Sequence, residues 1–290
     1  MAGMNAPEGE VKFVPKQALA PTPQLYDKLV SDSMENLAKA SLALLPRIAD
    51  GAMINDNGCG TGAATAAVVE SLKGSSTNVT VKGNDINKDA LIIYHKQAEE
   101  GGWPAEGVNM DSNYLGFATG TFDLTIGNAL LFVLPNDGMD AIKQVYRTLK
   151  SGGQAIFNSW AYVPNMLPLE VAVQETRPEG SPPPRAGLEK WTKADFLHQV
   201  IRDGGFEQNK ITVHQREVYT TVTEIHRYTN MLWSFIGGTT PIGWLESDEE
   251  NWDKAIEVII RELKKTDGYR EVEGGRSELK FTANIAVATK

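Results

Sequence analysis

The segment from Met53 to Gly62 constrains the fold more than any other part of this 290-residue chain. It reads Met-Ile-Asn-Asp-Asn-Gly-Cys-Gly-Thr-Gly and passes directly into a run of small residues at 63–67. Glycines at alternate positions leave no Cβ in the way, so a ligand can lie directly against the backbone. The free N–H groups at the start of the following helix add a polar, partly positive rim. The pattern predicts a buried strand, a ligand-binding turn and a helix start.

Two classes of cofactor fit this turn. Gly58-x-Gly60-x-x-Ala63 matches the dinucleotide pattern, whose acidic partner lies about 20 residues further on. However, Asp56 stands two residues before the first glycine, and Gly62 adds a third. The resulting Asp-x-Gly-x-Gly-x-Gly resembles the first motif of class I S-adenosylmethionine-dependent methyltransferases. In that family the glycines admit the adenosine and methionine portions of the cofactor, and the acidic residue orients the methionine end through backbone or water.

Strands and helices alternate along the middle of the chain. Apolar runs bounded by Gly, Asn and Ser clusters predict strands that end near residues 55, 85, 110 and 128, with a fifth at 154–159. Helices are predicted at 62–72, 88–100 and 138–149, and the second ends at Gly101-Gly102. The predicted fold class is α/β, with a doubly wound, Rossmann-like, mostly parallel sheet. The resemblance implies seven strands, the last antiparallel and placed between the fifth and the sixth.

The segments before and after these strands predict further elements around the sheet. Leu25, Leu29 and Leu37 recur near helical spacing, so one or two helices precede the first strand and resemble an N-terminal cap over the cofactor. A proline-rich stretch at 177–187 predicts an exposed loop or mobile flap. Helices near 224–236 and 249–265 form an insertion between strands at 211–222 and 281–288. We expect one domain, divided into a lead-in and cap (1–50), a cofactor-binding core (51–222), a helical substrate insertion (223–275) and a final strand (276–290).

Ligands bind beyond the carboxyl ends of parallel strands, so the residues at each predicted strand end are the candidate cofactor site. Asp85 follows the second strand and can accept two hydrogen bonds from ribose hydroxyls. Asp111 opens Asp-Ser-Asn-Tyr-Leu-Gly-Phe, which is similar to the family's Asp-Ala-x-x-Leu-Pro-Phe and implies an acceptor for the adenine amine. Ile86 would pack on the adenine face, and Tyr26 of the cap would lie near the ligand. The full set of predicted cofactor residues is Tyr26, Asp56, Asn57, Gly58, Gly60, Gly62, Asp85, Ile86, Met110, Asp111, Ser112, Asn128, Ala129 and Leu130.

The composition limits the partners and the compartment. A net charge of −9 and an acidic pI near 5.1 disfavour nucleic acid and anionic membranes as main partners. No apolar run approaches the roughly 18 residues that span a bilayer, and the first 20 residues lack a signal-peptide core. The single cysteine, Cys59, allows neither an internal disulfide nor a thiol cluster for zinc. We expect a cytoplasmic protein without a metal, and no pattern in the sequence fixes an oligomeric state.

The resemblance implies transfer of a methyl group from S-adenosyl-L-methionine to an S, O or N atom of a small organic metabolite. General similarity is greatest to methyltransferases of ubiquinone biosynthesis and fungal secondary metabolism. His226 is the candidate general base, and the candidate substrate residues are Trp160, Tyr162, Met231, Trp233 and Phe235. Two alternatives stay open at this point. One is an NAD(P)-dependent oxidoreductase, and the other is a methyltransferase-like fold used for binding or for a non-methylating cyclisation.

Overall fold

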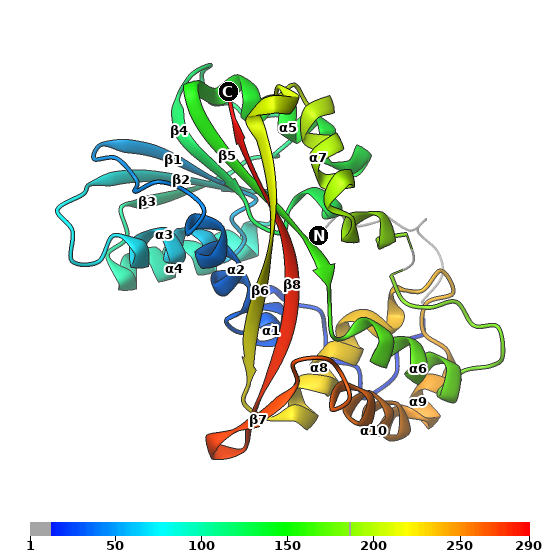
Figure 1. Ribbon diagram of the computed structural model, residues 1–290. Coiled ribbons are helices and arrows are strands. Elements are labelled where there is room, and N and C mark those ends of the chain that lie inside the picture. Colours follow the sequence, from blue (N-terminus) through cyan, green and yellow to red (C-terminus); the bar gives the residue numbers. More distant parts are fainter. Residues whose placement is uncertain (1–12, 186) are drawn as a thin grey trace.

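The structure, a computed structural model, describes residues 13–185 and 187–290 and contains one mixed sheet (Figure 1). The strand order is β3-β2-β1-β4-β5-β8-β6. Five neighbouring strands run parallel: β1 (Ala52–Asn57), β2 (Val79–Asp85), β3 (Ala105–Asn109), β4 (Phe122–Gly127) and β5 (Leu149–Tyr162). The last strand, β8 (Arg276–Thr289), is antiparallel to both β5 and β6 (Ile211–Val222) and lies between them. This position and direction confirm the prediction made from the resemblance.

The number of strands differs from the seven predicted. An eighth strand, β7 (Arg270–Val272), pairs with the first residues of β8. It belongs to a hairpin that turns through Gly274 and Gly275, both of which have positive φ. β7 is only three residues long and mostly exposed, so it carries no apolar alternation by which a sequence pattern could reveal it.

Helices cover both faces of the parallel strands, as the doubly wound class requires (Figure 1). On one face, α2 (Ser33–Leu42) and α3 (Ala63–Ser71) share a buried cluster with Ile54 of β1 and Ile126 of β4. α4 (Lys88–Gly101) follows β2 and contacts β2 and β3. On the other face, α5 (Met139–Thr148) and α7 (Ala194–Asp203) pack with Phe157 of β5. Short 3₁₀ turns lie at Leu131–Val133, Pro135–Gly138, Glu189–Thr192, Gln208–Lys210, Gly237–Thr239 and Glu273–Gly275.

Helix ends follow local sequence signals. α4 begins at an Asn87 cap, whose side chain accepts from the backbone of Asp89 and Ala90, and it ends at Gly102 with φ of +59°. The cap helix α1 (Pro23–Val30) begins after Thr22, whose hydroxyl accepts from Leu25 N, and proline occupies its first position. The structure therefore confirms two helices before β1.

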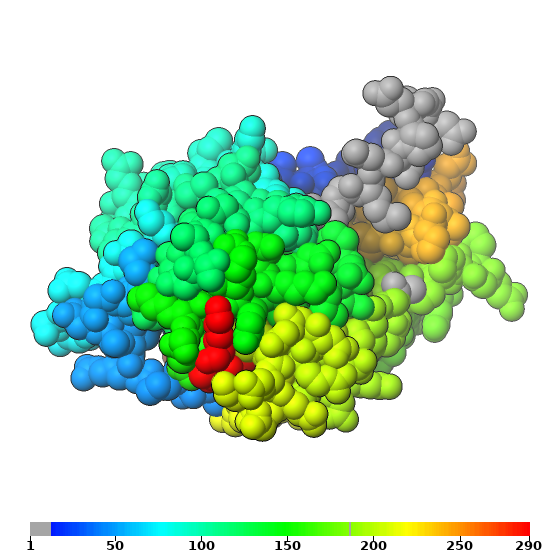
Figure 2. Space-filling view, turned by 90° about the horizontal axis from the view of Figure 1, so that it is seen from above, coloured from blue at the N-terminus to red at the C-terminus, as the bar shows by residue number. Residues whose placement is uncertain are grey.

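β5, β6 and β8 continue past the other strands and carry a second group of helices at their far end (Figure 1). These helices are α6 (Met166–Thr176), α8 (Ile225–Ile236), α9 (Glu246–Glu250) and α10 (Trp252–Leu263), which we call the lid. Val218 of β6 and Leu279 of β8 are buried in one cluster with residues of α6, α8 and α10. In Figure 2 the orange surface of the lid lies at one end of the molecule with dark-blue residues beside it, and the cyan segments lie away from it. The red C-terminal residues emerge between green and yellow segments, as the strand order requires.

The lid differs from its sequence prediction in two respects. α6 is absent from the predicted elements, because its hydrophobic residues surround the helix rather than forming one stripe and Pro168 lies in its first turn. The predicted flap at 177–187 begins with Arg177, which is buried and bonded within the lid, while most of the residues from Pro178 to Arg185 are exposed or half-buried. Within residues 13–185 and 187–290, none of the helices has the length and hydropathy needed to cross a membrane.

Candidate functional site

The glycine turn between β1 and α3 has a backbone that only glycine adopts easily. Gly58, Gly60 and Gly62 have φ of +71°, +52° and +108°. The turn is held to β2 because the N–H groups of Gly58 and Cys59 both donate to the carbonyl of Asn84, at 2.8 and 2.9 Å. A Cβ placed on Gly60 would meet no heavy atom within 4 Å. The middle glycine therefore presents an open backbone face, as a ligand cradle requires.

The other two glycines are required by packing. A Cβ on Gly58 would lie 2.5 Å from Leu130 Cδ1, in the loop after β4. A Cβ on Gly62 would lie 2.9 Å from the Trp103 ring and 3.1 Å from Tyr94. The predicted residue Leu130 thus contacts the turn, which brings the ends of β1 and β4 together.

Asp85, at the end of β2, lies against the same turn. Its Oδ2 accepts from Gly60 N at 2.9 Å, and its Oδ1 accepts from Asn87 N at 2.8 Å. Each carboxylate oxygen can accept a further hydrogen bond, so a diol could be added without breaking these contacts. The side chain of Ile86 is 53% exposed, although it is apolar and adjoins this carboxylate. A carboxylate beside an uncovered apolar side chain suits a ribose with its attached base.

The end of β3 is tied to the end of β2. Met110 N donates to the carbonyl of Asp85 at 3.1 Å. Asp111 Oδ1 accepts from both the backbone and the side-chain nitrogen of Asn113, which shapes the turn after β3. Ser112 is buried. The three strand ends predicted to hold the cofactor are therefore neighbours in the sheet.

Asp56 lies beneath the turn instead of on its open side. The carboxylate is 1% exposed, and its Oδ2 accepts from Thr65 N at 3.0 Å and from Thr65 Oγ1 at 2.7 Å. The same hydroxyl lies 3.0 Å from Tyr94 Oη. Burial raises the pKa of Asp56 to about 6, the hydrogen bonds from Thr65 oppose this shift, and the charge of Asp85 adds to it. Asp56 thus fixes the first turn of α3, and its buried carboxylate does not face the open side of the turn.

Two asparagines that the sequence analysis did not single out, Asn55 and Asn84, lie under the glycine turn together with Asn57. Asn55 Nδ2 donates to Asn84 Oδ1, and Asn84 Nδ2 donates to the predicted residue Asn57 Oδ1, each at 2.9 Å. All three side chains are fully buried. Central parallel strands normally read as aliphatic runs, so asparagines at 55, 57 and 84 are the signal that could have found this ladder. The ladder fixes Asn84, whose carbonyl holds the turn.

The cap helix α1 connects the glycine turn with the lid. Thr61 Oγ1 donates to Asp27 Oδ1 at 2.6 Å, and the ring of Tyr26 lies 5.8 Å from that of Phe235 in α8. Burial raises the pKa of Tyr26, against the opposing charge of Arg185. The cap thus joins the glycine turn to α8, and Tyr26 and Phe235, both predicted site residues, are in contact.

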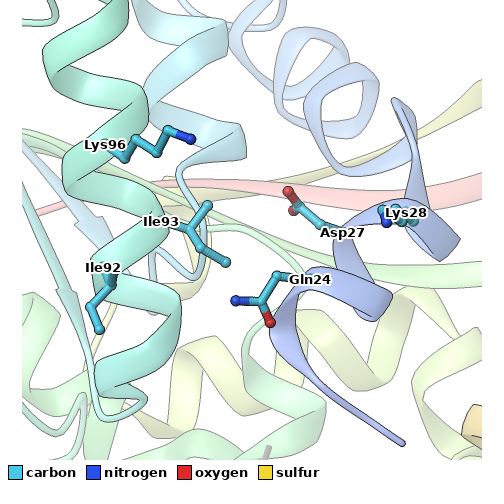
Figure 3. Close-up of a pocket in the computed structure, with 6 residues that line it drawn as sticks. All are labelled: Gln24, Asp27, Lys28, Ile92, Ile93 and Lys96. Atoms are coloured by element: carbon cyan, nitrogen blue, oxygen red, sulfur yellow. The ribbon is translucent and has the colours of Figure 1, made fainter. Parts of the chain in front are cut away.

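A cleft of about 500 Å³ opens between α1 and α4 (Figure 3). It is lined by Gln24, Asp27, Lys28, Ile92, Ile93 and Lys96. Asp27 is the residue that reaches from this cleft to the glycine turn, so the cleft borders the candidate site.

The predicted substrate residues occupy different environments. Trp160 packs on Phe281 with ring centroids 5.1 Å apart, and Tyr162 faces Thr266 and Asp267 near β7. Met231 and Phe235 are 6% and 9% exposed in α8. Trp233 is fully buried, 5.8 Å from the ring of Trp244, which gives it a packing role in the lid. His226 is exposed in the first turn of α8, where its backbone N–H donates to Glu224 Oε1.

Cys59 is buried beside Tyr94, and burial raises the pKa of its thiol. The nearby carboxylates of Asp56 and Asp85 raise the pKa further. A thiol held in its neutral form is a poor nucleophile, so Cys59 serves as a small packing residue of the turn.

Comparisons with known proteins concern the stretch that contains the glycine turn. Residues 54–153 match the family described as methyltransferase domain. Over 111 residues the chain is 34% identical to demethylmenaquinone methyltransferase of Bacillus velezensis. The matched stretch covers 38% of this chain and 46% of that relative. The chain therefore matches about half the length of this curated relative.

Solved structures share the fold at low sequence identity. Phosphoethanolamine N-methyltransferase 2 of Haemonchus contortus, solved with S-adenosyl-L-methionine, is 14% identical with a TM-score of 0.53, covering 92% of this chain and 56% of that one. The [4+2]-cyclase SpnF is 16% identical with a TM-score of 0.50, covering 89% and 80%. The stretch that matches the family includes β1, the glycine turn and the ends of β2, β3 and β4. Residues 54–153 thus match the methyltransferase-domain family, and the sheet that contains them has the fold of class I methyltransferases.

Proposed function

We propose that the protein is an S-adenosylmethionine-dependent methyltransferase that acts on an S, O or N atom of a small organic metabolite. The observation that carries this proposal is the open backbone face of Gly60, with the Asp85 carboxylate bonded to its N–H group. The family match over residues 54–153 supports it. Bound at this turn, the cofactor would supply a methyl group on a sulfonium, already activated for in-line displacement.

The residues of the chain would bind the cofactor and align it with the acceptor. Asp85 would accept hydrogen bonds from the ribose hydroxyls, Ile86 would cover the adenine, and Asp111 would face the adenine amine. Asn128, Ala129 and Leu130 would border the methionine end, opposite the glycine turn. Correct alignment of nucleophile, methyl carbon and leaving sulfur accounts for much of the rate in such a displacement. A thiolate needs no general base, whereas a hydroxyl benefits from one.

The lid supports an apolar, small-molecule acceptor. Tyr26, Phe235 and Trp160 are aromatic side chains of the cap, the lid and the end of β5, and they belong to one apolar cluster. A flat organic molecule suits such a lining, and a secondary metabolite is the class that we propose. Among the described residues the exposed imidazole of His226 makes no side-chain hydrogen bond. A thiolate acceptor would need no general base.

The decisive experiment combines cofactor titration with a transfer assay. We expect micromolar binding of S-adenosylhomocysteine by calorimetry and no binding of NADH. Incubation with methyl-labelled cofactor and panels of thiols, phenols and amines should then give one labelled product class by mass spectrometry. Binding of NADH alone would establish the oxidoreductase alternative instead.

A non-methylating function is the second candidate, because the fold is shared with a [4+2]-cyclase. In that case S-adenosylhomocysteine would bind, yet no label would reach any acceptor in a metabolite extract. An unlabelled substrate would instead be rearranged without loss or gain of atoms.

Substitution of Gly60 by alanine is expected to weaken S-adenosylhomocysteine binding at least tenfold while the protein stays folded. The new Cβ has room in the free protein and would stand in the proposed ligand space. Gly51 is a matched control, because it also has positive φ (+76°) and nothing within 4 Å, but it precedes β1. Both variants should lose a similar ~1 kcal/mol of stability from the left-handed backbone. Equal affinities of the two variants, measured by calorimetry, would contradict the placement of the ligand.

Substitution of Asp85 by alanine is expected to weaken the same binding by about 1–3 kcal/mol, through loss of charge-assisted hydrogen bonds. Circular dichroism should show an unchanged fold. Asp89 provides a control carboxylate, since it lies one turn further on, at the exposed start of α4. If Asp89→Ala weakened binding as much as Asp85→Ala, a general charge effect would replace the specific ribose contact.

A further inference from the structure

Asn158 of β5 is buried and makes three side-chain hydrogen bonds. Its Oδ1 accepts from the backbone N–H of Ala129 at 2.6 Å. Its Nδ2 donates to Asn128 Oδ1 at 2.9 Å and to Ser41 Oγ at 3.1 Å. Both amide hydrogens and one oxygen lone pair are thus used, and the side chain is 0% exposed. An amide so fully used within the protein has a role in holding its partners in place.

The first partner, Ala129, has a strained backbone. Its φ is +53°, in the left-handed region that is unfavourable for any residue with a Cβ. The next residue, Leu130, is the side chain that fills the space above Gly58. The hydrogen bond from Ala129 N to Asn158 Oδ1 therefore holds the backbone in the conformation that places Leu130 against the glycine turn.

The other partners reach the cap. Asn128 Nδ2 donates to the carbonyl of Met34 at 3.0 Å, and Ser41 Oγ donates to the carbonyl of Leu37 at 2.8 Å. Met34 and Leu37 both belong to α2, which lies next to α1 in the chain. Asn158 consequently joins three parts of the molecule: β5, the loop after β4 and the cap.

We propose that Asn158 is a positioning residue for the methionine end of the cofactor site. It acts through Ala129 and Asn128, which it holds in the one conformation that closes the loop against the glycine turn. This assignment rests on the proposed function, because it concerns the shape of the proposed cofactor site. None of its polar hydrogens is left for the ligand, so its effect is on alignment and affinity without direct contact.

The test measures S-adenosylhomocysteine affinity and thermal unfolding for four proteins: wild type, Asn158→Ala, Ala129→Gly and the double variant. We expect Asn158→Ala to weaken binding roughly tenfold, because the loop loses its anchor. In the double variant glycine adopts positive φ without strain, so most of the affinity should return. The control is Ser159→Ala, which removes a buried bond to the Trp191 carbonyl from the adjacent residue of β5. That variant should lower the unfolding midpoint and leave affinity unchanged.

The outcomes separate this assignment from the proposed function. Wild type that fails to bind overturns both, whereas wild type and Asn158→Ala that bind equally overturn the assignment alone. Equal weakening with and without Ala129→Gly also overturns it, because the loss would then not arise from the Ala129 backbone. If Asn158→Ala does not fold, Asn158→Ser replaces it in the same four-protein comparison and is judged by the same outcomes.

Discussion

Replacing Asp248 by asparagine is expected to lower the free energy of unfolding by about 3–5 kcal/mol. Asp248 and Arg177 form an ion pair in the lid whose side chains are both 0% exposed. Arg177 Nε and Nη2 donate to the two carboxylate oxygens at 2.7 and 2.8 Å. Its guanidinium also lies 5.6 Å from the ring of Trp233 and 5.9 Å from that of Trp244. Without its counterion, this arginine would remain charged in a site closed to water.

Urea denaturation measures the loss, and Glu175→Gln is the matched control. Glu175 pairs with Arg261 on the surface of the same lid, with side chains 38% and 47% exposed. An exposed pair contributes about 0–1 kcal/mol, so this variant should unfold almost as wild type does. Replacing both buried partners, as Arg177→Met with Asp248→Leu, should recover much of the stability, since no charge is left unpaired. A small loss in Asp248→Asn would mean that water reaches the pair and that the lid opens in solution.

The ion pair also shows why the lid was only partly predictable. Arg177 stands next to Pro178 in a stretch whose prolines and glycines predict an exposed loop, and most residues from Pro178 to Arg185 are exposed or half-buried. Its partner is 71 residues away in α9. Local composition reports turn chemistry and carries no information on a contact over that distance. The insertion after β6 is visible from helical periodicity, whereas its packing against α6 is not.

The cofactor core was predictable for a physical reason. Parallel strands joined by helices bring their carboxyl ends to one edge, so Asp85 and Asp111 had to fall near the glycine turn once the strands were identified. The bonds of Asp85 to Gly60 and of Met110 to Asp85 confirm that the strand ends are neighbours. Sequence order alone could not show that Asp56 turns beneath the loop towards Thr65. The orientation of the Asp56 side chain depends on which face of β1 it projects from, and the sequence does not fix that face where the strand ends.

Buried amides were the larger omission. Asn84 and Asn158 are polar residues inside strands, and sequence patterns treat such residues as weak strand formers or surface positions. Their roles depend on partners in other strands, such as Asn57 for Asn84 and Ala129 for Asn158. Full burial with satisfied hydrogen bonds distinguishes them from surface asparagines, and only the three-dimensional structure shows it.

Asp56 is expected to make the protein less stable as the pH rises from about 4 to about 6. Burial raises its pKa from an ordinary value of 3.8 to about 6, so the folded state holds the proton more tightly than the unfolded chain does. Below pH 3.8 the group is protonated in both states and costs nothing. Between the two values only the unfolded chain ionises, and the free energy of unfolding falls. Above pH 6 the full penalty, about 3 kcal/mol, is present.

The measurement compares wild type with Asp56→Asn by urea denaturation from about pH 2 to pH 7, a range that covers the acid titration of the control below as well. Asparagine keeps an oxygen that can accept from Thr65 and does not ionise, so the variant should gain stability relative to wild type as the pH rises. Asp123→Asn is the control of opposite sign. Partial burial tends to raise the pKa of Asp123, but the Lys150 ammonium and the Met53 N–H outweigh it and lower that pKa. The ionised Asp123 therefore stabilises the folded protein at neutral pH, and this stabilisation is lost in acid. A difference between wild type and Asp56→Asn that is flat with pH would show that Asp56 ionises as readily in the folded protein as in the unfolded chain. The carboxylate would then have access to water, or to a cation, at the base of the glycine turn.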